Sequence, residues 1–135
     1  MNDDLIYKDE VYKIMGACFS VYKEKGNGYT EPVYQDSMEI ELDYLKIPFD
    51  TQRNYPIYHR SVKLKHSYTP DLLCYDKIIL ELKAVKKLTP EHRAQVINYL
   101  KVTGCKVGLL VNFCGYPQLE WERLVNTGVE SANLQ

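Results

Sequence analysis

An apolar run from Ile78 to Val85, interrupted by two charged side chains, constrains this chain more than any other segment. The run reads IILELKAV, and its aliphatic composition is typical of a strand at the centre of a sheet. Glu81 and Lys83 are two positions apart, so the alternation of a strand directs both side chains to one face. An unpaired buried charge costs several kcal/mol. These groups must therefore pair with each other, reach water in a cleft, or bind an ion.

A second carboxylate is expected beside this strand. Asp71 lies ten residues before Glu81, and Tyr75-Asp76-Lys77 between them is typical of a tight turn. If that turn closes a hairpin, Asp71 returns beside Glu81. Two carboxylates and an amine suit a hydrated Mg²⁺ or Mn²⁺ ion acting on phosphate. The alternative is an exposed ion pair between Glu81 and Lys83 with Asp71 as a turn residue, and spacing alone does not decide.

Periodicity elsewhere predicts helices packed against a mixed sheet, an α/β architecture of the mixed α+β kind. Apolar positions at helical spacing predict a helix over 8–25, and Thr30 with Pro32 marks the start of a second helix that runs to about 44. Its expected buried residues are Tyr34, Met38, Glu41 or Leu42, and Leu45. Strands are expected over 51–59, 61–68, 71–75, 78–85 and 106–113, a helix from Thr89 to about 102, and a short strand or helix over 119–125.

Length and composition bound the class of protein. The chain has 135 residues, 45% of them hydrophobic and 26% charged, which favours a single globular domain over 1–135 and excludes disordered classes. We expect its core over about 5–125 and a frayed tail over 127–135. No apolar run approaches a membrane span, and the acidic start MNDDLIYKDE is unlike a signal peptide. A cytoplasmic protein without a membrane partner is therefore expected.

The charge is distributed unevenly along the chain. Residues 53–106 contain 11 Lys or Arg against 4 Asp or Glu, a net charge of +7, although the whole chain has a net charge of −1. A solvated face could produce part of this asymmetry. A concentrated positive segment is also what a surface that binds a polyanion needs.

Three motifs resemble those of a nuclease superfamily. Pro70-Asp71, nine residues, and then Glu81-Leu82-Lys83 resemble the PD-(D/E)xK motif of the restriction-endonuclease-like nucleases. The segment 95–99, QVINY, resembles the QxxxY motif of the RecB-like branch. The segment 28–34, GYTEPVY, resembles the signature of the GxxExxxY family, with its tyrosine one position earlier than that name suggests. The resemblance covers roughly residues 5–125.

The resemblance implies a restriction-endonuclease-like core and a role for each matching residue. Asp71 and Glu81 would be catalytic residues that bind the metal, and Lys83 would orient the attacking water or offset phosphate charge. Glu31 would complete the acidic set, although a glutamate in the first turn of a helix is favoured by the helix dipole whatever its function. Gln95 and Tyr99, on one face of the following helix, would brace the site. Expected substrate contacts are Lys86, Lys87, His92 and Arg93.

The function expected from these observations is a metal-dependent nuclease that hydrolyses phosphodiester bonds in DNA, with Mg²⁺ or Mn²⁺ as cofactor. The alternative is a nucleic-acid-binding module that keeps the nuclease scaffold without robust catalysis. A protein-interaction domain that uses exposed tyrosines is a third hypothesis. A lone domain of this size often needs a second copy or a partner protein to hold a duplex, so a homodimer stays open.

Overall fold

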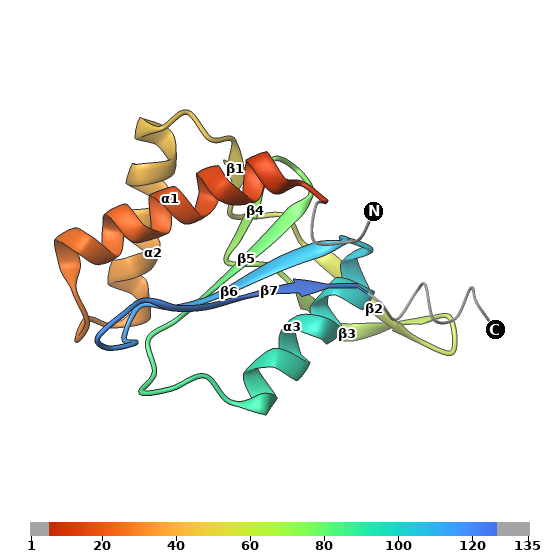
Figure 1. Ribbon diagram of the computed structural model, residues 1–135. Coiled ribbons are helices and arrows are strands. Elements are labelled where there is room, and N and C mark those ends of the chain that lie inside the picture. The colour runs from red at the N-terminus through yellow and green to blue at the C-terminus, as the bar shows by residue number, and fades with distance from the viewer. Residues whose placement is uncertain (1–5, 127–135) are drawn as a thin grey trace.

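A computed structural model, which describes residues 6–126, shows three layers with a mixed sheet in the middle (Figure 1). Helices α1 and α2 cover one face of the sheet and α3 covers the other. The strands of the sheet follow the order β1-β4-β5-β6-β7, and β5 and β6 are parallel. The elements are α1 (Lys8–Lys25), α2 (Glu31–Tyr44), β1 (Phe49–Asp50), β2 (Tyr55–His59), β3 (Val62–Tyr68), β4 (Leu72–Cys74), β5 (Ile78–Lys83), α3 (Pro90–Thr103), β6 (Val107–Asn112) and β7 (Glu120–Val125). The predicted mixed sheet flanked by helices is confirmed.

A tight turn sets the register of the β4–β5 hairpin. Tyr75 and Asp76 both have positive φ, 55° and 60°, and the Lys77 N–H donates to Cys74 O at 3.1 Å, which closes a tight turn between the two antiparallel strands. The strands pair Leu72 with Leu80, so the next pair along the ladder is Asp71 and Glu81. The hairpin predicted from the sequence is therefore confirmed.

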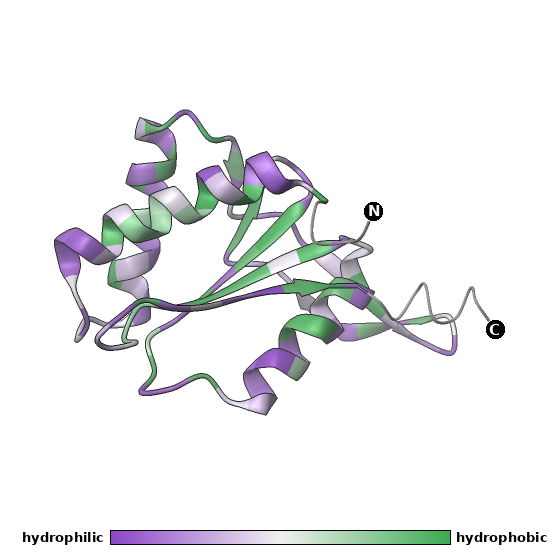
Figure 2. Ribbon diagram, in the orientation of Figure 1, coloured by the Kyte–Doolittle hydropathy of each residue, from purple (hydrophilic) through white to green (hydrophobic). Residues whose placement is uncertain are grey.

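Alternation along β5 divides its side chains between two cores. Ile78, Leu80 and Leu82 pack with α1 and α2, and Ile79 packs with α3 (Figure 2 shows the apolar centre of the sheet in green). On β6, Gly108 lies directly beneath α3, where an added Cβ would stand 3.1 Å from Val96 Cγ1. The absence of a side chain at Gly108 therefore lets α3 lie close to the sheet.

The segment before β4 differs from the prediction of one strand over 51–59. Residues 49–50 form β1, a short strand that pairs with β4, and residues 51–54 form no strand. Strands β2 and β3 form a two-stranded ribbon separate from the main sheet, and most side chains of β3 are exposed. In Figure 1 the ribbon projects beside the C-terminal part of α3.

The expected burial of Leu45 is wrong. Helix α2 ends at Tyr44, and Leu45 is 43% exposed. The chain reverses at Lys46, which has φ 60°, and Ile47 donates from its N–H to Leu42 O. This turn places Ile47, rather than Leu45, in the core.

The other predicted elements are observed within one or two residues of their predicted bounds, and the largest difference is at β5, which ends at Lys83, two residues before its predicted end. The segment left open over 119–125 is a strand, β7. The tail predicted over 127–135 lies outside the described residues. Each helix within residues 6–126 is too short or too polar to cross a lipid bilayer.

Candidate active site

The β4–β5 hairpin brings two acidic residues together near the carboxyl end of β5. Glu81 is only 7% exposed, and its Oε2 accepts hydrogen bonds from Tyr68 Oη at 2.7 Å and from the Asp71 N–H at 3.0 Å. Asp71 Oδ2 accepts from the Leu82 N–H at 2.8 Å. The Asp71 carbonyl accepts from Gln35 Nε2 of α2 at 2.9 Å. The pair is thus held by the hairpin itself, by β3 and by α2.

The electrostatics of this pair suit a divalent cation. Burial raises the pKa of Glu81 to about 7, and the neighbouring charge of Asp71 adds to the rise. Burial also raises the pKa of Asp71, with a contribution from Glu31. Within residues 6–126, hydrogen bonds engage only Oε2 of Glu81 and Oδ2 of Asp71. Two adjacent carboxylates, each with an unengaged oxygen and each disfavoured as an anion, fit Mg²⁺ or Mn²⁺.

Lys83 and α3 lie on the same side of the sheet as this pair. Lys83 Nζ donates to Gln95 Oε1 at 3.0 Å. One helical turn further along α3, Tyr99 stacks on Tyr68 with ring centroids 3.7 Å apart and planes 16° apart. Tyr68 in turn donates to Glu81. Helix α3 therefore contacts both charged residues of β5, one directly and one through Tyr68, as a bracing role for Gln95 and Tyr99 requires.

Glu31 lies at the margin of the pair. It begins α2, and its Oε2 accepts from the Ala84 N–H at 3.4 Å, just beyond β5. Across residues 6–126, no three His, Cys, Asp or Glu side chains gather closely enough to hold one metal ion. The structure thus brings Asp71 and Glu81 together, with Glu31 nearby rather than joined to them.

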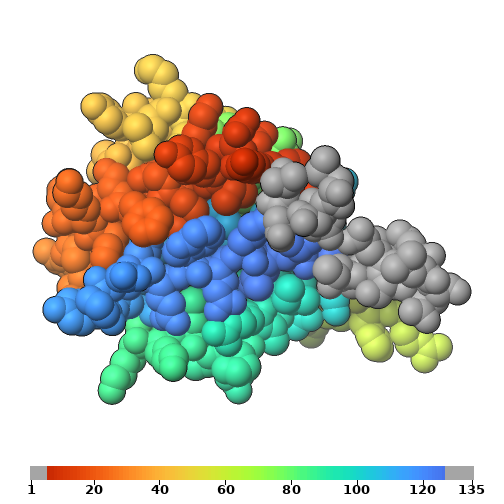
Figure 3. Space-filling view, in the orientation of Figure 1, coloured from red at the N-terminus to blue at the C-terminus, as the bar shows by residue number. Residues whose placement is uncertain are grey.

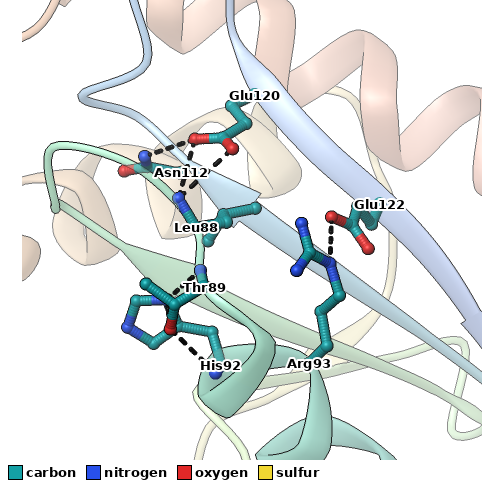
Figure 4. A network of polar contacts seen from close by, with 7 residues as sticks. All are labelled: Leu88, Thr89, His92, Arg93, Asn112, Glu120 and Glu122. Carbon is teal, nitrogen blue, oxygen red and sulfur yellow. Dashed lines mark hydrogen bonds and ion pairs between the residues drawn. The ribbon is translucent and has the colours of Figure 1, made fainter.

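The four residues expected to contact substrate divide into two kinds. Lys86 and Lys87 are exposed on the loop 84–89. His92 Nδ1 accepts from the Thr89 N–H at 3.0 Å and completes a capping box at the start of α3. Arg93 forms an ion pair with Glu122 of β7 (Figure 4). The charge of Arg93 is thus already matched, whereas both lysines face solvent.

Sequence reasoning missed a buried polar network beside the site. Asn112 is fully buried at the end of β6, where its amide donates to Val85 O at 2.8 Å and accepts from Val85 N–H at 3.0 Å. It also donates to Glu120 Oε1, and both oxygens of Glu120 accept from the Leu88 N–H (Figure 4). These bonds hold the loop that follows β5 against the end of β6 and the start of β7. A lone amide within the apolar run VGLLVNF was the signal that could have revealed this network.

Tyr68 and Gln35 were missed as well. Tyr68 ends a strand whose other side chains are exposed, and it is buried at 6% exposure. Gln35 reaches Asp71 from another layer of the fold. A tyrosine at the end of a predicted strand, three residues before Asp71, was a usable signal, but nothing in the local sequence marked Gln35.

The fold and the site together define a class of protein. The domain has a mixed sheet between helices, and two carboxylates and a lysine lie near the carboxyl end of its central strand. This combination is that of a nuclease-like α/β domain. A family model described as the PD-(D/E)XK nuclease superfamily matches residues 8–124, and the chain belongs to that superfamily. The restriction-endonuclease-like fold is thereby confirmed, and a nuclease-like function is indicated. No curated protein and no solved structure matches the chain.

Proposed function

We propose that the protein is a metal-dependent nuclease that hydrolyses phosphodiester bonds in DNA, with Mg²⁺ or Mn²⁺ held by Asp71 and Glu81. The observation that carries this proposal is the buried carboxylate pair with raised pKa values, close to the Lys83 amine. A divalent ion at the pair would supply a water of lowered pKa and charge stabilisation at the phosphate. Glu31 would add negative charge at the margin of the site.

The protein's own residues have distinct parts in this hydrolysis. The oxygen of water bonds to phosphorus as the bond from phosphorus to the leaving oxygen breaks, and the leaving oxygen takes up a proton. The Lys83 ammonium, held by Gln95, would orient the water or stabilise the negative charge that develops on the phosphoryl oxygens. Tyr68 keeps the Glu81 carboxylate in place.

Exposed basic residues support a nucleic acid as the substrate. The turn and outer strand of the β2–β3 ribbon present Arg60, Lys63 and Lys65 to solvent. Lys86 and Lys87 are exposed on the loop that follows the site. Such cations hold the phosphate backbone through contacts that weaken as salt rises and that do not distinguish one base sequence from another.

The finer resemblance agrees with this proposal. Gln95 and Tyr99 carry the QxxxY pattern of RecB-like nucleases, and both contact groups of the proposed site. Gly28, Glu31 and Tyr34 carry the pattern that resembles the GxxExxxY family, and Glu31 lies beside the end of β5. We propose on this resemblance that the chain is related to these branches of the superfamily.

The test is a cleavage assay with end-labelled DNA and RNA of one sequence, each in Mg²⁺, in Mn²⁺ and in EDTA. We expect DNA cleavage with either metal, none in EDTA, and none for Glu81→Gln. The matched control is Glu91→Gln, which makes the same change at an exposed position in the first turn of α3. Absence of cleavage with both metals, or equal cleavage by wild type and Glu81→Gln, would overturn the proposal. Preferential cleavage of RNA would overturn the choice of DNA.

A further inference from the structure

A second feature near the proposed active site is an open cleft between two loops. It has a volume of about 970 Å³. The loop 84–89 and the start of α3 form one wall, with Lys86, Lys87 and His92, and the loop 113–119 forms the other, with Tyr116. The two loops lie side by side at the lower left of Figure 3. This volume is within the range of pockets that enclose small organic ligands.

The walls of the cleft are held by hydrogen bonds. Asn112 binds the main chain of the loop 84–89 at Val85. Glu120 binds the same loop at Leu88 (Figure 4). On the other wall, Tyr22 Oη donates to Gly115 O at 2.6 Å. A Cβ at position 115 would stand 2.8 Å from Gln118 O, so the turn there needs glycine. The cleft is therefore formed before any ligand arrives.

The lining of the cleft combines cations with an exposed aromatic ring. Lys86 and Lys87 are exposed, and neither forms an ion pair within residues 6–126. The side chain of Tyr116 is 80% exposed. Glu120 also lines the cleft, but its two oxygens already accept hydrogen bonds from Leu88 and Asn112. Free cations beside an exposed ring are the means by which proteins hold single-stranded nucleic acid, whose bases can stack on aromatic side chains.

The cleft is close along the chain to Lys83 of the proposed active site. Its lining begins at Val85, two residues after Lys83, and the Phe113 N–H donates to Lys83 O at 2.9 Å at the root of the opposite wall. Both walls of the cleft are therefore joined, through the main chain, to the end of the strand that carries Lys83. A base in a duplex is paired and stacked, so its faces are not free for Tyr116.

We propose that this cleft binds an unpaired nucleotide next to the scissile phosphate, with its base stacked on Tyr116 and its backbone phosphates on Lys86 and Lys87. The substrate class is then single-stranded DNA or a duplex with an unpaired end or gap. This inference rests on the proposed function for its place beside the cleaved bond. The binding it predicts is measured without cleavage.

The test is fluorescence anisotropy in EDTA with a labelled oligothymidylate of about 12 nucleotides and a blunt duplex of equal length. For Tyr116→Ala we expect the Kd for the single strand to rise by about tenfold, and the Kd for the duplex to stay unchanged. Tyr116→Phe should retain binding, because the ring is kept. The matched control is Tyr12→Ala, which removes a tyrosine that is 81% exposed on α1 and should leave binding unchanged.

A second measurement addresses the charges and does not alter the Tyr116 loop. Replacing Lys86 and Lys87 together with Gln should reduce the slope of log Kd against log salt, measured with the single strand, by about 1.4, which is about 0.7 for each lysine. An unchanged salt dependence, no effect of Tyr116→Ala, or an equal loss for single strand and duplex would each overturn the inference.

The two proposals fail in different ways. Tight, Tyr116-dependent binding of the single strand without cleavage in Mg²⁺ or Mn²⁺ would overturn the proposed nuclease function and support the cleft. Cleavage whose preference for single strands is unchanged in Tyr116→Ala would support the nuclease function and overturn the cleft.

Discussion

Replacing Glu81 with Gln should stabilise the metal-free protein at alkaline pH. Gln keeps an oxygen that can accept from Tyr68 Oη and from the Asp71 N–H, and it removes a charge that is only 7% exposed. Burial, and then the neighbouring charge of Asp71, raise the pKa of Glu81 from 4.5 to about 7. At about 1.4 kcal/mol per pH unit, this shift means that ionised Glu81 lowers the free energy of unfolding by roughly 3 kcal/mol.

The sign of the pH dependence follows from proton binding. Between pH 4.5, the ordinary pKa of a glutamate, and about pH 7, the folded state holds a proton at Glu81 that the unfolded state has released. The free energy of unfolding of the wild type therefore falls as pH rises through this window. The advantage of Glu81→Gln over the wild type should be small near pH 4, grow across the window, and level off above about pH 8.

Urea denaturation in EDTA at a series of pH values measures this difference directly. The matched control is Glu91→Gln, which makes the same change at an exposed position in the first turn of α3. If the curves of wild type and Glu81→Gln run parallel across the window, Glu81 is not a buried carboxylate under repulsion. The electrostatic argument for a metal at this pair would then be refuted.

Three further predictions concern the charges and the buried network. Lys83→Met should lower cleavage by about a hundredfold or more with little loss of unfolding free energy, and equal cleavage rates for Lys83→Met and its surface control Lys13→Met would contradict this role. Mg²⁺ or Mn²⁺ should stabilise the wild type by about 2.7 kcal/mol at a hundredfold excess over Kd and so raise its melting temperature, whereas the melting temperature of Asp71→Ala should not change. An equal response of the two proteins in calorimetry would place the ion elsewhere. Asn112→Ala should lower the unfolding free energy in urea by about 1–3 kcal/mol, because the half-buried N–H and C=O of Val85 both lose their hydrogen-bond partner. An unchanged midpoint would show that water replaces the amide.

The site residues of the β4–β5 hairpin could be predicted because their arrangement depends on local rules. Strand alternation puts Glu81 and Lys83 on one face, and a tight turn fixes the partner of Glu81. Both rules act within about a dozen residues, so the sequence carries them directly. The functional roles assigned to these residues remain predictions.

The rest of the site depends on contacts between distant segments. Tyr68 meets Glu81 only because the β2–β3 ribbon leads back to the edge of the hairpin, and Gln35 meets Asp71 from another layer. Neither contact follows from periodicity. Leu45 was misplaced for a related reason, since a backbone turn at Lys46 overrides the spacing of apolar residues in the helix.

The close approach of α3 to the sheet at Gly108 has a consequence for any search for inactive variants. Helix α3 bears Gln95, which holds the Lys83 amine. The distance between α3 and the sheet, however, is set by Val96 and Leu100, which lie over Gly108. A methyl group at position 108 would stand 3.1 Å from Val96 Cγ1 and 3.3 Å from Leu100 Cδ2, so these side chains would have to move by a few tenths of an ångström, and a larger side chain would displace α3 and Gln95 further. Displacements of about 1 Å at a reacting group can lower rates by about a hundredfold. Random mutagenesis scored by activity should therefore return position 108 alongside the acidic residues, although this glycine has no side chain to offer a metal or a phosphate.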